Sequence, residues 1–357
     1  MFKKISFIAF LVLILLFIAC SKNNDKFTYD KIIKIKDSSE IIKVKTINFI
    51  NIESITEFEF FDKYLVLIDK YSDFMIKVYS LKTNKIVAEF GRKGQGPSEF
   101  ISPSDIVKDN LNGDCFYIYD ISTNLIKKFC FSKIIKNDFN PDRITLFKNS
   151  TIFEIKKIKN GFMGTGIIGK SRLAIFNESG EVIKKIGELP IREEKEVLIS
   201  SHSHAFRSSF VILRKKNKVF MALRFASILE EYDLGKQSLT NVYGCPEIFF
   251  PNYDIVPVMQ YYTMSRNKDT RFGFLDIDYN DENECLYLLY SGEKTFDNKG
   301  RATQGYRSNM IYVMNLKGEI IKKIKLDKDI ITIKFDNSLS YIYGAASNGI
   351  VKIEYKE

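Results

Sequence analysis

The sequence predicts an all-β fold, a six-bladed β-propeller whose last blade is closed by a strand from near the N-terminus. Three observations predict it. From residue 41 onward the chain consists of short apolar or alternating runs, separated by turns rich in Asn, Asp, Gly and Ser. One strand-and-hairpin unit recurs at irregular intervals of roughly 45 to 70 residues, the range of propeller blades. Long helical patterns are missing, and the abundant Phe and Tyr favour strands.

Residues 1–20 predict a lipoprotein signal peptide. Lys3 and Lys4 form a basic start, and the apolar run "ISFIAFLVLILLFIA" leads directly to Cys20. The run is short for a transmembrane helix and ends in a small residue, as secretory signals do. The segment "FIAC" resembles a bacterial lipobox, with Phe17 where Leu is usual. The resemblance implies cleavage before Cys20 and lipidation of its thiol, and a plain uncleaved anchor is the alternative.

Residues 21–40 begin with the polar run "SKNNDK" and predict a flexible tether behind the anchor. In lipoproteins of Bacteroidota an acid-rich stretch at this place favours the outer face of the outer membrane. Here one early acid, Asp25, is present. We therefore expect lipid anchoring to the outer membrane of the cell envelope and leave the periplasmic and the surface face open.

The formal net charge is +10, but the lysines are spread along the whole chain and form no patch. Together with the many Ile and Asn residues, this is typical of an AT-rich genome. The functional alternative is attraction to an anionic partner such as lipopolysaccharide, an acidic glycan or nucleic acid. Since no basic patch is visible, we expect no nucleic-acid partner.

The repeat unit is a strand, a link and a hairpin whose second arm alternates Lys with apolar residues. The first unit contains "YLVLID", "MIKVYSL" and "KIVAEF", and the second opens with "CFYIYD" and "LIKKFCF". The third contains "GFMGTGII" and "SRLAIFNESGEVIKKIGE", and the fourth contains "KVFMALR" and "ILEEYDLGKQSLTNVYG". The fifth contains "CLYLLYS" and "MIYVMNLKGEIIKKIKL".

The sixth unit, "ITIKFD", "LSYIYGAA" and "GIVKIEY", has only three strands before the chain stops. The run Ile41–Ile50 can supply its fourth strand, which would close the ring and leave no free sheet edge there. No linker or change of composition divides the chain after that point. We therefore predict a single propeller domain at residues 41–357.

The stretch "FGRKGQGPSEF" at residues 90–100 has the glycines of a phosphate-binding loop. Such a loop needs a Gly-Lys-Ser/Thr ending and a helix whose N-terminal amides face the anion. Here Pro97 follows Gly96, and no helical pattern comes after it. We interpret the stretch as the turn from one blade to the next, with glycines that adopt positive φ.

Two of the five cysteines can be tested as a pair. If the two strands around "ISTN" form a hairpin with Asp120 opposite Leu125, Cys115 stands opposite Cys130. A disulfide is one outcome of this register, and two buried thiols are the other.

Histidine is scarce, with only His202 and His204 in "SSHSHAF". On a strand, this spacing projects both rings to one face, where they could hold a metal such as Zn²⁺. A solvated loop or a polar strand at the propeller face is the alternative.

Carboxylates gather in "DIDYNDENE", from Asp276 to Glu284. An EF-hand loop would require Gly at its sixth and Glu at its twelfth position, and Asp281 and Tyr287 stand there instead. A looser Ca²⁺ site and a solvated turn between strands are the two interpretations.

The interval "NYDIVPVMQYYTMSRNKDTRFGF", Asn252–Phe274, is richer in aromatic and hydrogen-bonding residues than the blades around it. Long insertions in propellers gather on one face, and loops carry function. A cover strand is the alternative to a ligand site. The residues that could stack on or hydrogen-bond a sugar or peptide are Tyr253, Tyr261, Tyr262, Arg266 and Arg271.

Residues 91–129 carry a resemblance to the repeat of NHL-type propellers, a Gly-rich turn followed by Phe, Pro, an apolar-Asp strand, a "YxxD" strand and an Asn-x-Ile hairpin. With the lipobox and the motifs "LYLLYSG", "IYVMNLKGEIIKKIKLD" and "YIYG", the chain is similar to the TolB-like six-bladed β-propeller lipoproteins of Bacteroidota. This implies the fold and little about chemistry, since that family is mostly without assigned activity. The matching residues are Gly91, Gly94, Gly96, Phe100, Pro103, Ile106, Asp109, Tyr117, Asp120, Asn124, Ile126 and Phe129.

We expect a non-catalytic binding or scaffold module, monomeric and without a cofactor, whose partner is a protein or glycan of the envelope. The sequence lacks the Gly-x-Ser-x-Gly elbow that would indicate a serine hydrolase. The alternative is a propeller enzyme of the lyase or lactonase type, with Ca²⁺ or Zn²⁺ in the central channel. It would place Asp105, Asp276 and Asn252 around the centre of the ring.

Overall fold

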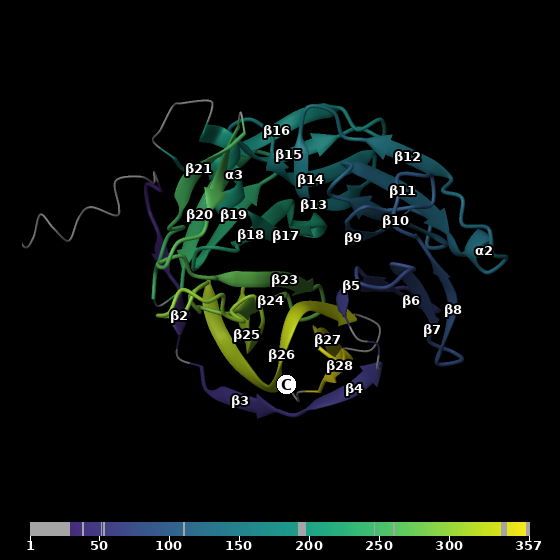
Figure 1. The fold of residues 1–357 in the computed structure, drawn as a ribbon. Helices are drawn as coiled ribbons and strands as arrows, with labels where there is room; N and C mark the ends of the chain where they lie inside the picture. Colours follow the sequence, from purple (N-terminus) through teal and green to yellow (C-terminus); the bar gives the residue numbers. More distant parts are fainter. Residues whose placement is uncertain are drawn as a thin grey trace, which may run out of the picture.

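The computed structural model describes residues 29–354 apart from 38, 51, 53, 110, 192–197, 246, 260 and 337–340. Its small β-sheets are arranged as blades around a central axis, and the chain passes from blade to blade in sequence order (Figure 1). This confirms the predicted all-β propeller. Within the described residues, no helix is long and apolar enough to cross a membrane.

The first three blades are four-stranded antiparallel sheets whose strands follow in sequence order. The first contains β5 (Ile55–Phe60), β6 (Tyr64–Asp69), β7 (Ile76–Ser80) and β8 (Lys85–Phe90). The second contains β9 (Pro103–Lys108), β10 (Cys115–Asp120), β11 (Leu125–Cys130), the short helix α2 (Phe131–Ile134) and β12 (Arg143–Leu146). The third contains β13 (Thr151–Ile158), β14 (Gly161–Ile167), β15 (Ser171–Phe176) and β16 (Val182–Glu188).

The other three blades also take strands from the N-terminal part of the chain. The fourth contains β17 (Ser208–Leu213), the 3₁₀ turn η2 (Arg214–Lys216), β18 (Lys218–Leu223), β19 (Ile228–Asp233) and β20 (Ser238–Gly244). The fifth contains β23 (Phe274–Asn280), β24 (Cys285–Tyr290), β25 (Ser308–Asn315) and the start of β26 (Glu319–Asp336). The sixth contains the end of β26, β27 (Tyr341–Ala346), β28 (Gly349–Ile353) and β4 (Thr46–Ile50).

Strand β26 belongs to two blades, which is why they form one continuous sheet. Its first part pairs with β25, with Lys325 opposite Met310. Its last part pairs with β27, with Ile333 opposite Gly344. The strand therefore serves as the outer strand of the fifth blade and the inner strand of the sixth.

The ring closes through β4, which pairs antiparallel with β28 and places Thr46 opposite Ile353. The predicted closure by an N-terminal strand is therefore confirmed. The predicted run Ile41–Ile50 is in fact two strands, because β3 (Ile41–Val44) pairs with β26 of the fifth blade instead. Residues 41–50 thus join the last two blades from outside (Figure 1).

Part of the predicted tether is ordered on the propeller, which corrects its boundary. Strand β1 (Ile33–Lys34) pairs in parallel with β20, and β2 (Lys36–Asp37) pairs in parallel with β26. Residue Ile35 between them is buried against the fourth and fifth blades. The sequence signal misled because these strands are only two residues long and carry exposed lysines.

The hydrophobic core is divided among the blade interfaces. Six clusters each combine residues of two neighbouring blades, for example Phe58 with Tyr343 across the sixth–first interface. A blade is buried on both faces in this arrangement, so the middle strands β6, β10 and β24 are almost wholly buried. The six interfaces are consistent with six blades.

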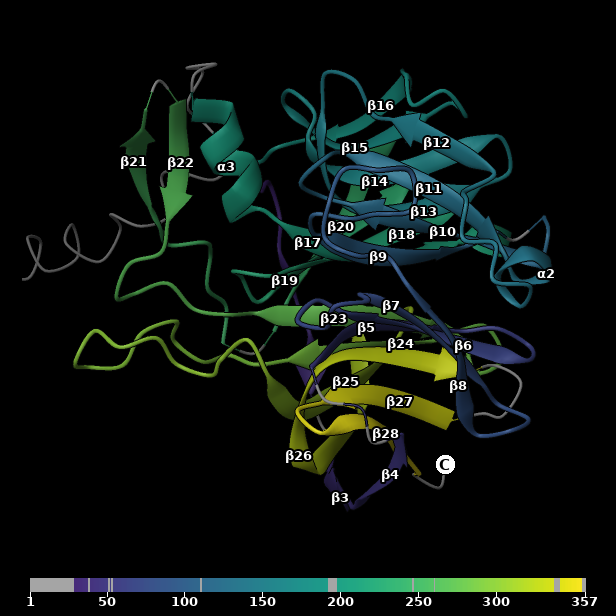
Figure 2. The same ribbon diagram turned by 45° about the vertical axis from the view of Figure 1, so that its right-hand side comes forward.

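Two insertions pack together beside the ring. One follows the third blade and contains α3 (Ile199–Ala205), and the other follows the fourth and contains the hairpin of β21 (Asp254–Val258) and β22 (Tyr261–Ser265). The hydroxyl of Ser200 donates to the backbone oxygen of Tyr262, 3.2 Å away. Helix and hairpin form a projection from one face of the ring (Figure 2).

The stretch at residues 90–100 is a turn between the first two blades, as interpreted. The amide of Gly96 donates to the Glu99 carboxylate at 2.8 Å, and its carbonyl accepts from Lys127 at 3.0 Å. Only Gly91 of the three glycines has a positive φ, of 82°. A Cβ there would lie 2.8 Å from the buried ring of Phe100, so the close approach also requires glycine.

A buried ion pair joins the third and fourth blades. The guanidinium of Arg172 lies 2.9 Å from Glu230, and both side chains are almost completely buried. Arg172 also donates to the Phe206 carbonyl at 2.8 Å, and the hydroxyl of Tyr29 donates to Glu230 at 2.6 Å. The N-terminal part of the chain is therefore attached to the ring through this pair.

Replacing Arg172 by Ala should destabilise the protein by about 3–5 kcal/mol, because Glu230 would remain buried without its cation. Urea unfolding measures this loss. The matched control is Arg301→Ala, which removes a surface ion pair with Asp297 and should change the free energy of unfolding by less than about 1 kcal/mol. An equal loss of unfolding free energy in both variants would contradict the conclusion that the Arg172–Glu230 pair stabilises the ring.

Candidate functional site

The central channel is a cavity of about 520 Å³ that all six blades line. The inner strand of each blade pairs on one side only, so its other edge faces the channel. Polar residues stand at these edges, where a strand meets solvent instead of core. Representatives from the six inner strands are Glu57, Asp105, Glu154, Ser209, Asp276 and Thr332.

Carboxylates in the channel accept hydrogen bonds from the free strand edges. Asp276 accepts from the amide of Ile277 on its own strand and from the amide of Ile333 on β26, both at 2.9 Å. Asp278 joins the same two strands in the same way. Glu154 accepts from the amide of Phe210 on the next blade at 3.2 Å. These acids hold neighbouring inner strands together.

Lysines pair with acids across blades in the same channel. The ammonium of Lys334 lies 3.1 Å from Glu57, and that of Lys108 lies 2.9 Å from Glu59. Burial by itself would lower the pKa of Lys334, but Glu57 and Glu59 outweigh it and hold the pKa well above its usual value. The lysines therefore stay charged and link the first blade to its two neighbours.

Two of the channel acids, Glu57 and Asp105, have pKa values raised to near neutral pH. Burial, opposed by Lys334, raises the pKa of Glu57 to about 7. Burial, together with the charge of Glu154, raises the pKa of Asp105 to about 6. Both carboxyl groups thus change protonation close to neutral pH, and Glu57 also takes part in the ion pair that connects the first and sixth blades.

Arginines dominate the end of the channel at the fourth blade. Arg207 precedes β17 and Arg224 follows β18, and the pairing of Ser208 with Leu223 places them side by side. Both line the channel and also a second cavity of about 410 Å³, which Arg266 and His204 complete. We call Arg207, Arg224 and Arg266 the arginine cluster.

The arginine cluster has no acidic partner in the described part of the chain. Each guanidinium instead lies within 6 Å of a ring centroid, that of Phe153, Phe272 or Phe296. Burial and the nearby Arg207 lower the pKa of Arg224 to about 10. The cluster is therefore a concentration of positive charge that an anion would relieve.

The two histidines lie on the helix α3, so the expectation of a strand was wrong. Positions two apart on a helix point in nearly opposite directions. His202 is buried and bonds the hydroxyl of Tyr253 through Nδ1 at 2.5 Å, while His204 packs on Phe153 and lines the arginine cavity. Burial and Arg207 lower the pKa of His204. The rings do not converge on one metal position.

The five proposed ligand residues do not form one site. Arg266 lines the second cavity, whereas Tyr253 is held by His202 and Tyr262 lies on the exposed hairpin. The guanidinium of Arg271 forms a bidentate ion pair with Glu247, with contacts of 2.5 and 3.1 Å. The side chain of Tyr261 lies outside the described part of the structure.

The channel residues of the enzyme hypothesis are separated in the structure. Asp105 and Asp276 line the channel, but Asn252 lies in the insertion and bonds Asn267 at 3.0 Å. The residues from Asp276 to Glu284 do not converge either, because Asp276 and Asp278 bond the sixth blade. Among the described residues, the only group of three close metal-ligating side chains is Asp114, Cys115 and Cys130.

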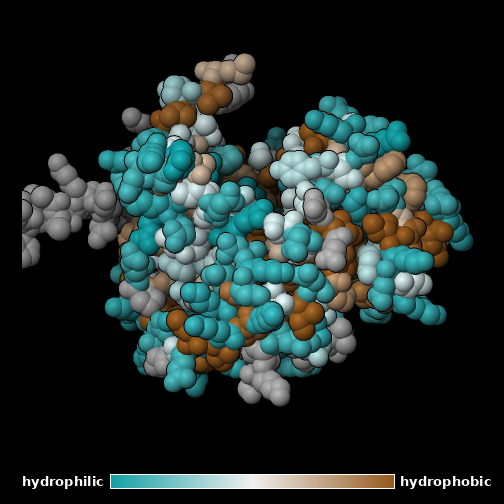
Figure 3. Space-filling model, turned by 60° about the horizontal axis from the view of Figure 1, so that its bottom comes forward, coloured by the Kyte–Doolittle hydropathy of each residue, from teal (hydrophilic) through white to brown (hydrophobic). Residues whose placement is uncertain are grey.

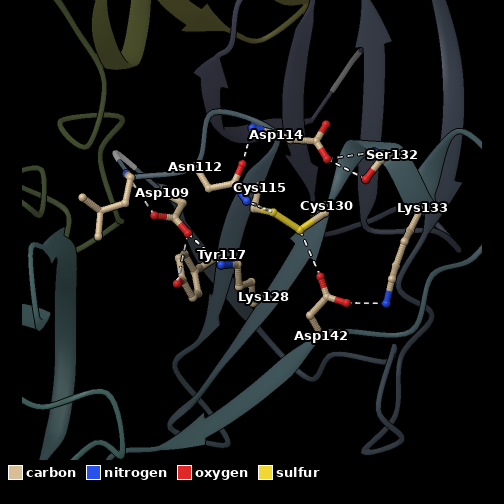
Figure 4. Close-up of a disulfide and its surroundings, with 11 residues drawn as sticks. Asp109, Asn112, Asp114, Cys115, Tyr117, Lys128, Cys130, Ser132, Lys133 and Asp142 are labelled. Carbon is tan, nitrogen blue, oxygen red and sulfur yellow. Dashed lines mark hydrogen bonds and ion pairs between the residues drawn. A yellow bond between two sulfur atoms is a disulfide. The ribbon is translucent and has the colours of Figure 1, made fainter.

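Cys115 and Cys130 stand opposite each other in the β10–β11 hairpin, with Cα atoms 4.0 Å apart. Their sulfur atoms are at bonding distance, as drawn in Figure 4. Asp142 lies 3.0 Å from the sulfur of Cys130 and pairs with Lys133 (Figure 4). The predicted register of this hairpin, with Asp120 opposite Leu125 and Cys115 opposite Cys130, is the one observed. Both cysteines are buried.

Sequence reasoning missed most of the site. Arg207 and Arg224 adjoin predicted strands, and nothing in the sequence around either residue marks the two as partners. The available signal was a polar residue at alternate positions in the first strand of each blade. This pattern indicates that the channel is polar, but it does not indicate which charged residues lack an ion-pair partner.

The family model described as TolB-like 6-blade propeller-like matches residues 37–338. Among solved structures, the chain is similar to a member of the DUF4221 family from Bacteroides vulgatus, with a TM-score of 0.51 and 11% identity over 85% of this chain and 92% of that one. It is also similar to U3-55K, with a TM-score of 0.52 and 8% identity over 87% and 98% of the two chains. Identities this low support the fold alone. No curated protein sequence matches the chain.

The raised pKa of Glu57 predicts that stability falls as pH rises from about 5 to 7. The unfolded carboxyl loses its proton near 4.5 and the folded one near 7, so the native state binds more protons in this window. Replacing Glu57 by Gln should reduce the slope, by up to about 1.4 kcal/mol per pH unit. Urea unfolding across the pH range measures it, with Glu282→Gln in an exposed turn as control. An unchanged slope in the Glu57 variant would contradict the shift.

Proposed function

The chain belongs to the TolB-like 6-blade propeller-like family, and on this basis we propose that it is a lipid-anchored, non-catalytic binding or scaffold module of the cell envelope. Its partner is an envelope protein or glycan that presents an acidic group to the arginine cluster. One observation carries this proposal. Three guanidinium groups line two cavities that share Arg207 and Arg224, and none of the three forms an ion pair with an acid among the described residues.

The chemistry of arginine favours a carboxylate, sulfate or phosphate as the bound group. Its planar fork of donors matches two oxygens of such a group, and its charge persists when it is buried. The aromatic rings beside Arg207, Arg224 and Arg266 limit the freedom of the guanidinium groups before binding. Exposure increases from Arg224 to Arg266, so a ligand would enter at Arg266.

The other charged groups of the channel support a structural role. Asp276, Asp278 and Glu154 bond strand edges, and Lys334 and Lys108 pair with acids of the first blade. A residue held in this way positions blades and has few free donors or acceptors for a reaction.

The proposed anchor rests on the lipobox-like segment that ends at Cys20, which lies outside the described residues. Attachment there would present the ring at a membrane surface, where a binding module meets envelope partners. The phylum follows from the same resemblance and is part of this proposal, which covers either face of the outer membrane.

Replacing Arg224 by Met should weaken binding of the acidic partner without loss of stability. Met keeps a flexible apolar contact with Phe272 and removes a cation that Arg207 repels, so we expect an equal or higher Tm. Loss of charge-assisted hydrogen bonds should weaken binding by about 10- to 100-fold.

The measurement is a glycan array and affinity capture from native envelopes, followed by calorimetry on the captured partner. Arg271→Met is the matched control, because its ion pair with Glu247 lies outside both cavities. Unchanged binding in the Arg224 variant would show that the arginine cluster is not the binding site. Stoichiometric Ca²⁺ or Zn²⁺ in the purified protein would instead favour the metal-dependent enzyme.

Replacing Cys20 by Ala should remove the attached lipid, because no thiol is left at this position to carry it. The intact mass of the mature wild-type protein should exceed the mass of its polypeptide by that of the attached lipid. Cys285→Ala, at a buried cysteine of β24, is the control and should keep the lipid. A mature wild-type chain without added mass would refute the anchor.

A further inference from the structure

The hairpin β21–β22 exposes apolar side chains at its end. The exposed fraction is 49% for Val258, 99% for Met259 and 41% for Tyr262. Apolar residues are visible on the projection in Figure 3, on a face that is otherwise mainly hydrophilic. In the described part of the chain, no element covers this end of the hairpin.

The backbone of the hairpin turn makes the exposed methionine unusual. Val258 pairs with Tyr261, so Met259 lies in the tight turn and has a φ of 54°. Asn, Asp and Gly are the residues that favour this left-handed conformation, and a long apolar side chain does not. The position thus combines an unfavourable backbone for Met with almost complete exposure of its side chain. A local rule broken in this way is characteristic of a contact surface.

The N-terminal part of the chain is fixed at the base of the same hairpin. The ring of Tyr29 stacks on Phe250 with centroids 6.2 Å apart, and both pack in one cluster with Met264. Met264 pairs with Ile255 across the hairpin. Val258 follows Ile255 by three residue steps along β21, a rise of about 10 Å. The apolar end therefore lies close to the place where the chain enters the fold.

The length of chain before Tyr29 limits how far the ring can stand from its anchor. Tyr29 follows Cys20 by nine residue steps, which can span at most about 30 Å in any conformation. A lipid on Cys20 would keep the membrane surface within this reach of the hairpin base. Since β1 runs beside β20 on the side where β21 lies, the projection and the entering chain share one side of the ring (Figure 1).

We infer that the end of the hairpin, Val258, Met259 and Tyr262, docks into the surface of the lipid bilayer to which the chain is anchored. The inference rests on the proposed anchor at Cys20. Met and Val supply apolar contact, and tyrosine is favoured at the boundary between lipid and water. Arg266 follows β22 directly, so this contact also holds the arginine cluster on the membrane side of the ring.

The absence of Trp from the sequence allows a direct test, because Met259→Trp introduces a single reporter. The full-length lipidated protein is placed in vesicles of phosphatidylethanolamine and phosphatidylglycerol, with or without brominated acyl chains. We expect a blue-shifted emission and at least about a twofold loss of fluorescence with the brominated lipid. Ile135→Trp, 52% exposed after α2, is the control and should show neither effect.

A second variant separates contact from folding. Met259→Asn suits the left-handed turn, so the Tm should not fall. With Tyr262→Trp as the reporter, adding Met259→Asn should reduce quenching by the brominated lipid at least about twofold. An unchanged level of quenching would show that Met259 makes no contact and would overturn the inference.

If tryptophans at positions 259 and 135 of the anchored protein show the same emission and the same quenching, the inference is also overturned. A blue shift at position 259 with native envelope extract, but not with lipid alone, would assign the hairpin to a protein partner and refute the bilayer. Failure of every variant to float with vesicles would refute the anchor, and the docking surface with it. The intact mass of the mature chain distinguishes this failure from the others.

Discussion

The need to satisfy the edges of its β-sheets governs how this propeller is built. A blade leaves an unpaired edge at the channel and another at the rim, and an unpaired edge exposes backbone donors and acceptors. At the rim, β1, β2 and β3 cover the edges of the fourth and fifth blades, and β4 completes the sixth. At the channel, Asp276, Asp278 and Glu154 accept hydrogen bonds from the edge amides. The same requirement therefore explains the N-terminal strands and the polar centre.

This constraint also separates the charged groups of the channel into two kinds. Acids and lysines have partners on neighbouring blades, so their burial is compensated and they connect the ring. The arginine cluster has no such partner in the described part of the chain, and it lies where the fourth blade meets the two insertions. Like charges held close together oppose stability, and an anionic ligand would relieve this repulsion. The uncompensated charge is thus the feature of the channel that points to binding.

The insertions make one side of a regular ring different from the others. Helix α3 and the β21–β22 hairpin come from different blade junctions, yet they share a cluster with Tyr29 and Met264. The buried pair of Arg172 and Glu230 fixes Tyr29 at this place. Ligand cavity, projection and chain entry are therefore assembled on one side. A module held by its N-terminus would present these features together.

The sequence alone determined the properties that depend on neighbouring residues. Alternation with a period of two specified the strands and the blade order, and hairpin counting placed Cys115 opposite Cys130, because pairing across a short turn is local. The sequence could not show that Arg207, Arg224 and Arg266 share a cavity, or that "SSHSHAF" forms a helix against a hairpin some 60 residues later. Those facts depend on how six sheets close around an axis. Closure brings together side chains that are remote along the chain, and only the tertiary structure decides which of their charges find partners.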